Sequence, residues 1–430
     1  MDIVMTIAQW IADNIFGQPA FMIGIVALIG LIVQRKTFSQ VITGTMKTIV
    51  GFLIIVAGTN IVVSALLTFT PILQAAFGFT DPAIPETAIG LDQMMAQYGS
   101  VAALIMAFGF LFHVLLARFT KFKYIYLTGH LMFWIALVLT TIMIEINPAA
   151  PQWKIVLIGS IIAGIYWTLQ PAVTQPMMRK LTGNDTLAYG HTSASSSWLS
   201  AQIAKLKPLN KPENSTEDMN LPEGLSFFRD VTVATAFVIS IVVLVASFFA
   251  GRETMVGLAG GVDPSIFSVL QGFNFAVGIG IMLYGVRMIL GEIIPAFRGI
   301  AMKVVPGAVP ALDCPIIFDY APTAVIFGFL ATFATFLVCM VIFGATGFAV
   351  IIPPMIMIFF VGAPAGVFGN AYGGVRGALV GGLLVGLWLA FGQAITAPML
   401  AHTAPELAQL ADPDWYLIIW IFKPLLSLIL

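Results

Sequence analysis

The chain has 430 residues, of which 59% are hydrophobic and 9% charged. An ordinary soluble domain has about 25% charged residues, so this composition excludes a soluble globular protein. Nineteen Lys and Arg against twenty Asp and Glu give a formal net charge of −1, which offers no electrostatic case for nucleic acid as a partner. Because a transmembrane helix needs about 20 apolar residues, the composition predicts an all-α polytopic membrane protein with about 11 transmembrane helices in one domain, residues 1–430.

The amino-terminal segment predicts a short helix that lies along the membrane surface, because Ile3, Ile7 and Trp10 share one helical face beside polar residues. No basic residue precedes Arg35, and no small-residue cleavage site follows the first apolar run. We therefore expect no removable signal peptide.

The candidate spans follow from the apolar runs along the chain. These runs are residues 20–34, 48–70, 99–117, 124–146, 155–172, 231–250, 265–288, 322–345, 347–362, 377–397 and 414–430. Several runs are short or interrupted by Gly and Pro, which is typical of the discontinuous helices and re-entrant hairpins of transporters.

The expected orientation follows from the basic residues, because Lys and Arg are enriched in cytoplasmic loops. If the spans alternate, four basic clusters fall on one face: Arg35, Lys36 and Lys47; Arg118, Lys121 and Lys123; Arg179, Lys180, Lys205, Lys207, Lys211 and Arg229; and Arg287, Arg298 and Lys303. The loop 71–100 carries acidic residues and neither Lys nor Arg, so we expect it outside. This pattern predicts an external amino terminus and a cytoplasmic carboxyl terminus.

The hydrophilic segment 205–230 divides the chain into a first half, residues 1–204, and a second half, residues 231–430. A weak internal echo supports the division: Gly30, Arg35, Gly44, Lys47 and Gly51 recur approximately as Gly285, Arg287, Gly299, Lys303 and Gly307. Transporters often place their ligand between such repeats, although chance similarity also accounts for the echo.

A histidine lies early in an otherwise apolar span, in the segment LTGHLMFW at 127–134. Ionisable groups are expensive in a membrane and usually face a cavity, which makes His130 a site candidate. A buried structural histidine is an equally good interpretation.

Four prolines break any continuous helix across residues 304–322, so this segment predicts a hairpin that dips into the membrane. Asp313 and Asp319 lie within it, with no basic residue in the hairpin. A carboxylate here suits a ligand that donates hydrogen bonds, such as a sugar hydroxyl, or a proton relay. The alternative is a helix-capping aspartate.

Three other features are weaker signals. Residues 189–198 combine His191 with many hydroxyls, which indicates a polar groove or an ordinary loop, and they lack the Gly-x-Ser-x-Gly pattern of a hydrolase. Glycines at 366–377 surround Asn370 and favour close helix packing over a phosphate loop. Cys314 and Cys339 lie in apolar sequence and predict neither a disulfide nor a zinc site.

Taken together, these segments resemble the membrane (IIC) component of the bacterial phosphotransferase system for L-ascorbate, in the ascorbate/galactitol group. The resemblance runs through most of the chain. Its strongest points are GTMKTIVGFLIIVAGTN at 44–60, LTGHLMF at 127–133, PGAVPALDC at 306–314, AP at 321–322, and GVFGN with GGVRGAL at 366–379.

The resemblance implies a transporter of the bacterial inner membrane whose substrate is phosphorylated, as it reaches the cytoplasm, by a separate IIB subunit carrying a phosphocysteine, with IIA as a further cytosolic partner. It implies a homodimer in which a core substrate domain moves against a dimerising domain. We expect no cofactor, no metal and no phosphoryl-transfer residue in this chain. The basic segment 179–211 is the expected docking surface for the cytosolic partner, and an ordinary positive-inside loop is the alternative.

The resemblance also implies site residues. His130 and Asp313 match substrate contacts, His191 and Thr192 match a histidine and the contact after it, and Thr87 lies in an external region with ligand contacts. The segment of Ile55, Val56 and Ala57 matches one that presents backbone groups. The family pattern has glutamine where Val56 and Trp134 stand, tyrosine where Ala88 stands, and glutamines in place of the residues that follow His191.

These departures leave the substrate open between ascorbate and galactitol or another polyol. Ascorbate is an anion, yet the candidate contact segments contain no Lys or Arg, so it would rely on helix amino termini, backbone N–H groups and histidine. A neutral polyol needs none of these. The alternative from another class is a proton-coupled secondary transporter with Asp313 and His130 as the relay.

Overall fold

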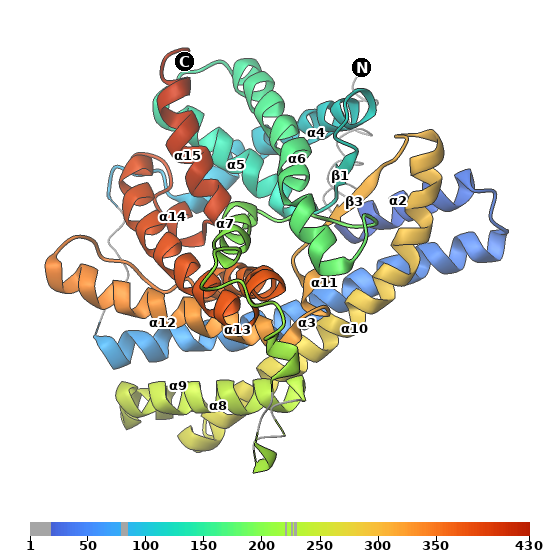
Figure 1. The fold of residues 1–430 in the computed structure, drawn as a ribbon. Coiled ribbons are helices and arrows are strands. Elements are labelled where there is room, and N and C mark those ends of the chain that lie inside the picture. Colours follow the sequence, from blue (N-terminus) through green and yellow to red (C-terminus); the bar gives the residue numbers. More distant parts are fainter. Residues whose placement is uncertain (1–18, 79–84, 220–221, 225–226, 228–229) are drawn as a thin grey trace.

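The computed structural model describes residues 19–78, 85–219, 222–224, 227 and 230–430. The predicted amino-terminal surface helix therefore lies outside the described residues. Within them, eight helices are long and apolar enough to cross a membrane, as expected for an all-α polytopic membrane protein (Figure 1). These are α3 (Phe38–Phe77), α4 (Leu91–Phe119), α5 (Gly129–Ile146), α6 (Gln152–Thr182), α8 (Val231–Ala250), α10 (Pro264–Lys303), α12 (Pro322–Thr346) and α13 (Met355–Thr396).

The described residues also form shorter helices, two of which correspond to predicted spans. The shorter helices are α2 (Pro19–Val33), α7 (Ala194–Ala204), α9 (Arg252–Ala259), α11 (Pro315–Phe318), α14 (Leu407–Leu410) and α15 (Pro413–Leu426). The predicted runs 20–34 and 414–430 correspond to α2 and α15, which have 15 and 14 residues. Helices of this length are shorter than the roughly 20 residues that span a bilayer.

Two further predicted runs, 347–362 and 377–397, overlap the single element α13, which is a helical hairpin. Gly374 interrupts it with φ 58° and ψ −148°, a conformation almost restricted to glycine. A Cβ atom on Gly369 would lie 2.2 Å from the carbonyl oxygen of Gly377, so the arms 355–373 and 375–396 run side by side. The glycine-rich segment therefore serves close helix packing, as the sequence predicted.

The two halves of the sequence do not form separate bodies. Helix α3 from the first half packs along α10 from the second, and α5 packs against α15 (Figure 1). Two glycines of the internal echo lie in the α3–α10 contact: a Cβ atom on Gly285 would lie 2.8 Å from the carbonyl oxygen of Gly51. Small residues let helix backbones approach this closely, which is how membrane helices associate.

A small sheet, most of whose residues are buried, was not predicted. Strands β1 (Tyr124–Tyr126), β3 (Val309–Leu312) and β2 (Ala188–Tyr189) are all parallel, in the order β1-β3-β2. The segment 304–322 thus contains a strand and the one-turn helix α11 instead of the predicted hairpin. Its prolines prevent a continuous helix, and pairing with two strands satisfies backbone groups that the membrane would leave unpaired.

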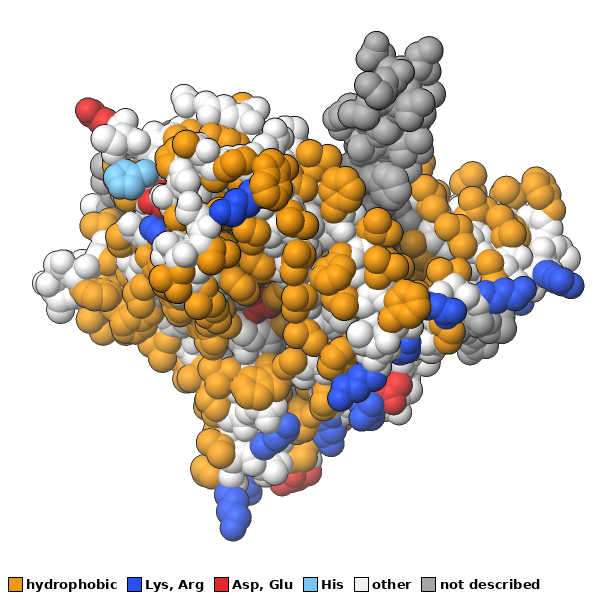
Figure 2. Space-filling view, turned by 90° about the horizontal axis from the view of Figure 1, so that it is seen from above, with side chains coloured by type: hydrophobic (Ala, Val, Ile, Leu, Met, Phe, Trp, Pro, Cys, Tyr) orange, Lys and Arg blue, Asp and Glu red, His pale blue; other side chains and the backbone are white. Residues whose placement is uncertain are grey.

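Three of the four basic segments lie near one another. Gln34, at the end of α2, donates a hydrogen bond to the carbonyl of Pro295 in α10 (2.8 Å). The carbonyl of Lys123 accepts from the amide of Val309 (2.8 Å), and its ammonium donates to the carbonyl of Arg118. Figure 2 shows Lys and Arg side chains gathered along one side of a largely hydrophobic surface.

The carboxyl-terminal residues lie away from these loops. Asn147, just beyond the far end of α5 from β1, donates a hydrogen bond to the carbonyl of Leu430 (3.0 Å), and Lys154 donates to that of Ile429 (2.7 Å). This placement differs from the prediction that the carboxyl terminus shares a face with the basic loops. The reason is an extra reversal: after Thr403 bonds Glu145 at the end of α5 (2.7 Å), the chain turns back inward before α15 leads out again.

An ion pair joins α10 to the segment after α11. The Nε and NH2 groups of Arg287 lie 2.9 Å and 2.6 Å from Oδ1 of Asp319, and Arg287 belongs to an apolar candidate span. We expect Arg287→Asp and Asp319→Arg each to lower the unfolding temperature, and the double swap to restore it. A thermal double-mutant cycle in detergent should give a coupling of roughly 0.5–3 kcal/mol.

The pair Arg179 and Asp185 is the comparison, because both side chains are 57% exposed, whereas Asp319 is 27% exposed although Arg287 is 67% exposed. Exposed ion pairs contribute only about 0–1 kcal/mol, so the same cycle there should give a smaller coupling. Equal coupling free energies for the two pairs would show that the Arg287–Asp319 ion pair stabilises the protein no more than an ordinary surface pair.

Candidate functional site

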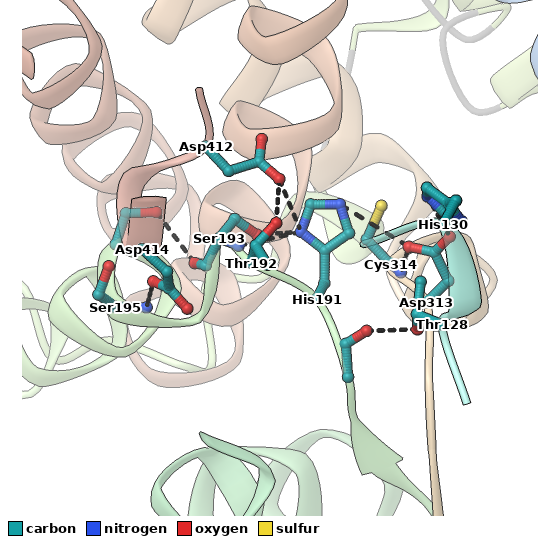
Figure 3. Close-up of polar contacts among 12 residues, drawn as sticks. Thr128, His130, His191, Thr192, Ser193, Ser195, Asp313, Cys314, Asp412 and Asp414 are labelled. Carbon is teal, nitrogen blue, oxygen red and sulfur yellow. Dashed lines mark hydrogen bonds and ion pairs between the residues drawn. The ribbon is translucent and has the colours of Figure 1, made fainter. Parts of the chain in front are cut away.

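The candidate site lies where the three parallel strands end. The carboxyl ends of parallel strands meet at one edge, and each strand here is followed directly by a polar segment. His130 follows β1 at the start of α5, His191 follows β2 before α7, and Asp313 follows β3 before α11 (Figure 3). The hydroxyl of Thr128 donates to the carbonyl of Gly190, which ties the first two segments together.

The carboxylate of Asp313 lies between the two imidazoles. Its Oδ2 atom is 3.6 Å from Nε2 of His130, and its Oδ1 atom is 3.7 Å from Nε2 of His191. The side chains of His130 and Asp313 are 49% and 30% exposed, whereas that of His191 is 5% exposed. His130 and Asp313 therefore remain accessible to a ligand, with His191 behind them.

The ring of His191 is oriented by the residues that follow it. The backbone N–H of Ser193 donates to Nδ1 (3.0 Å), and the Ser193 hydroxyl lies 2.9 Å from Nδ1 and 2.7 Å from the hydroxyl of Tyr189. Because an N–H group can only donate, Nδ1 is an acceptor, and the neutral ring carries its proton on Nε2. His191 thus directs an N–H group at Asp313.

The same tautomer bears on metal binding. Among the described residues, His191, Asp313 and Cys314 have donor atoms that all lie within 4.8 Å of one another. A metal would need the lone pair of Nε2, which is protonated when Nδ1 accepts from Ser193. The donor set therefore fits hydrogen bonding to a ligand better than coordination of an ion.

A second carboxylate, Asp412, approaches His191 from the side opposite Asp313 (Figure 3). The hydroxyl of Thr192 donates to its Oδ2 atom, which also lies 3.9 Å from Nδ1 of His191. Sequence reasoning missed this residue. Its one signal is the Asp412-Pro413 pair, which predicts the start of a helix rather than a site.

The next acidic residue has a structural role. Asp414 accepts hydrogen bonds from the amide of Ser195 (2.8 Å) and the hydroxyl of Tyr166 (2.6 Å), and its own amide donates to the carbonyl of Thr192 (3.0 Å). These bonds fix the start of α15 against the start of α7. Asp414 itself does not line the cavity.

These groups open into a cavity of about 600 Å³. One wall is polar and comes from the ends of the strands and the segment before α15; the facing wall is apolar and comes from α2, α3, α10 and α13. The amino terminus of α5 also opens here, with no side-chain cap at Thr128. The cavity-lining residues include Thr59, Thr128, His130, Trp134, His191, Ile289, Asp313, Phe360, Asp412 and Trp415.

The predicted contacts divide into two groups. Those that line the cavity are Ile55, Val56, His130, Trp134, His191 and Asp313. Thr192 lies behind them, fully buried against Asp412. Ala57 and Thr87 are exposed and do not line it. Shortly after Thr87, the amides of Ile89 and Gly90 donate hydrogen bonds to the carbonyls of His402 and Thr403.

The prediction for residues 55–57 needs a correction. The segment was expected to present backbone groups, but it lies in the middle of α3, which is helical from Phe38 to Phe77. Helical N–H and C=O groups bond within the helix and are not offered to a ligand. Ile55 and Val56 therefore contribute apolar side chains to the cavity.

The hydroxyls after His191 mostly serve packing. Ser200 donates to the carbonyl of Ala365 (2.7 Å), and Ser196 donates to that of Ser193 (3.0 Å). At the tip of the α13 hairpin, Asn370 accepts from the amide of Thr216 (2.9 Å), which anchors the hydrophilic segment there. Cys314 and Cys339 are both buried.

Comparisons with known proteins agree with this architecture. A family model described as "PTS system sugar-specific permease component" matches residues 14–414. The chain is also 26% identical over 430 residues to a protein of Mycoplasma pneumoniae named "Ascorbate-specific PTS system EIIC component", an alignment that covers 88% of this chain. The chain spans 64% of the length of that relative.

Proposed function

Since the chain belongs to the family of sugar-specific permease components of the phosphotransferase system (PTS), we propose that it is a IIC component that binds L-ascorbate and carries it inward for phosphorylation by a separate IIB subunit. The relative from Mycoplasma pneumoniae supports ascorbate by its name. The proposal places this multi-pass protein in a bacterial inner membrane, with IIA as the further cytosolic partner.

One observation carries the proposal: His130, His191 and Asp313 converge on a cavity enclosed by candidate membrane spans. Two imidazoles and a carboxylate offer both donors and acceptors, as a ligand with several hydroxyl groups requires. The uncapped amino terminus of α5 adds N–H groups and a positive dipole end for an anion. This arrangement suits ascorbate without Lys or Arg.

The proposed ligand contacts are His130, His191 and Asp313, and Ile55, Val56 and Trp134 form the surrounding wall. Thr192 does not line the cavity here, so its proposed role in binding is to hold Asp412 beside His191. Ala57 and Thr87 remain proposed contacts for a different position of the moving domain, since neither lines the cavity here. Trp134 stacks on Trp415 with ring centroids 5.5 Å apart, which gives the cavity a flat aromatic surface.

The movement of the protein is also a proposal. Helices α2, α3, α8, α9 and α10 would form the dimerising part of a homodimer, and the remaining helices, with the strands, the substrate core. The cavity lies where α3 and α10 face the strand ends, so sliding of one group past the other would change its access. We propose that the basic loops face the cytoplasm, that the amino terminus lies outside, and that segment 179–211 receives the IIB subunit.

A neutral polyol such as galactitol is the second candidate substrate. Among the described residues that line the cavity there is no Lys or Arg, whereas Asp313 and Asp412 both line it. Carboxylates accept hydrogen bonds from hydroxyl groups and repel an anion. This observation favours a neutral ligand, so the binding of galactitol has to be compared with that of ascorbate.

A calorimetric binding screen of the purified protein with ascorbate, galactitol and several pentitols tests the proposal. We expect ascorbate to bind, His130→Ala to abolish binding, and the control His402→Ala to leave it intact, because the His402 side chain is exposed and remote from the cavity. Binding of galactitol alone would establish the second candidate. Ascorbate binding that His130→Ala leaves unchanged would contradict the site.

A further inference from the structure

Among the described residues, no lysine or arginine lines the cavity to balance the charge of its second carboxylate. Asp412 lines the cavity, is 4% exposed, and follows the inward turn of the chain that ends at α15. The ionisable groups that share its cavity, among the described residues, are His130, His191, Asp313 and Cys314. Neither histidine carries a fixed charge as a lysine or arginine would.

The contacts of Asp412 hold it in place without neutralising it. The hydroxyl of Thr192 and the ring of His191 both approach Oδ2, and Nδ1 of His191 already accepts from Ser193. Thr192 supplies a neutral hydrogen bond, so the carboxylate keeps its acceptor character. Figure 3 shows the second oxygen of Asp412 pointing away from His191.

A charge in such an enclosed, largely apolar site acts strongly on a ligand. Asp412 is only 4% exposed, so little solvent screens its carboxylate. A like charge is then repelled more strongly than at an exposed surface, while a hydroxyl donor is attracted. Asp313 is partly offset by the two Nε2 atoms that face it. Asp412 has no equivalent pair of donors.

We propose that Asp412 sets the charge selectivity of the cavity: its carboxylate weakens the binding of an anionic sugar acid relative to that of a neutral polyol. This inference rests on the proposed function, since it concerns the ligand of the same site. It makes the charge of one residue responsible for the relative affinities of the two candidate substrates. Asp412 acts on the ligand by its charge and on His191 and Thr192 as a positioning residue.

The first test compares the affinities of L-ascorbate, an anion, and galactitol, a neutral polyol, in wild type and Asp412→Asn. Asparagine keeps the shape of the side chain and an oxygen for Thr192 but removes the charge. We expect the ratio of the two dissociation constants to shift toward ascorbate by roughly tenfold or more. A ratio that stays constant would overturn the inference.

Asp414→Asn is the matched control. It removes a neighbouring buried carboxylate that bonds Ser195 and Tyr166 and does not line the cavity. Loss of packing at α15 would change both affinities together, so we expect this variant to leave their ratio unchanged. An equal shift in ratio for the two variants would assign the effect to packing instead of to the charge of Asp412.

A second readout does not depend on the proposed function. Because Cys314 also lines the cavity, both native cysteines are first replaced by alanine. A cysteine placed at Val56, which lines the cavity, is then modified with an anionic and a cationic methanethiosulfonate reagent. We expect Asp412→Asn to raise the anionic rate relative to the cationic rate severalfold, and Asp414→Asn to leave the ratio unchanged. If Asp412→Asn shifts the rate ratio but the protein binds neither ascorbate nor galactitol, the proposed function is rejected and the role of Asp412 is retained. If the protein binds ligand but Asp412→Asn changes neither the ratio of dissociation constants nor the ratio of modification rates, the role of Asp412 is rejected and the proposed function is retained.

Discussion

Replacing Asp313 by asparagine is expected to weaken ligand binding by roughly 10- to 150-fold, because a hydrogen bond to a charged group contributes about 1.5–3 kcal/mol. Asp313 is the acceptor that both His130 and His191 face, and it is open to the cavity. The amide of asparagine places an N–H₂ group against at least one imidazole donor. Isothermal titration of the purified variant with ascorbate and galactitol measures the loss.

Asp185→Asn is the control for this variant. Asp185 pairs with Arg179 at an exposed position outside the cavity, so its loss should leave affinity unchanged. The thermal unfolding temperature of Asp313→Asn should stay close to that of wild type, because the side chain is partly exposed. An Asp313→Asn variant that binds the wild-type ligand with unchanged affinity would remove Asp313 from the site.

Replacing Gly374 by alanine is expected to prevent folding or to lower stability by more than about 3 kcal/mol. Its φ of 58° and ψ of −148° lie in a region almost restricted to glycine, where strain alone costs about 1–3 kcal/mol. A Cβ atom there would also lie 2.2 Å from the carbonyl oxygen of Asn214 and 2.5 Å from that of Lys211. The tip of the α13 hairpin would have to separate from the hydrophilic segment.

Gly183→Ala is the control that separates the cost of backbone strain at positive φ from the cost of a steric clash of the new Cβ atom. Gly183 has φ 75° and ψ 4°, in the left-handed helical region, and a Cβ atom there would meet nothing within 4 Å. We expect a loss of only about 1 kcal/mol, the ordinary cost of a left-handed residue other than glycine. Size-exclusion profiles and thermal unfolding compare the two variants. Equal losses would mean that the contact with Asn214 and Lys211 is unimportant.

Much of the fold follows from local sequence. Runs of apolar residues locate the long helices because a membrane requires them, and the glycines at 366–377 predict the close packing seen in the α13 hairpin. Hydrophobicity alone does not distinguish a full crossing from the shorter helices α2 and α15. Periodicity likewise does not reveal that Gly374 folds two predicted runs into one hairpin.

The small sheet could not be predicted from patterns within each segment. Strands of two to four residues are too short for an alternating pattern, and β3 even contains Pro310. They exist because three distant segments pair with one another. The same pairing explains why His130, His191 and Asp313, singled out separately as polar groups in apolar sequence, lie together.

Asp412 could not be predicted as a site residue from the sequence. Its neighbours in the chain indicate a helix start, and its link to Thr192 joins residues separated by 220 positions. The reversal that brings it inward depends on contacts between Thr403 and Glu145 at the end of α5. The same reversal places Leu430 on a different side from the one predicted by alternating spans.

The most direct test of the central claim is uptake of labelled ascorbate into membrane vesicles that contain this protein, with and without phosphorylated IIB inside. We expect a phosphorylated product to accumulate only when IIB is present, and uptake to persist when the proton gradient is dissipated. Accumulation of unmodified ascorbate without IIB, lost when the proton gradient collapses, would contradict the proposed function and identify a proton-coupled transporter.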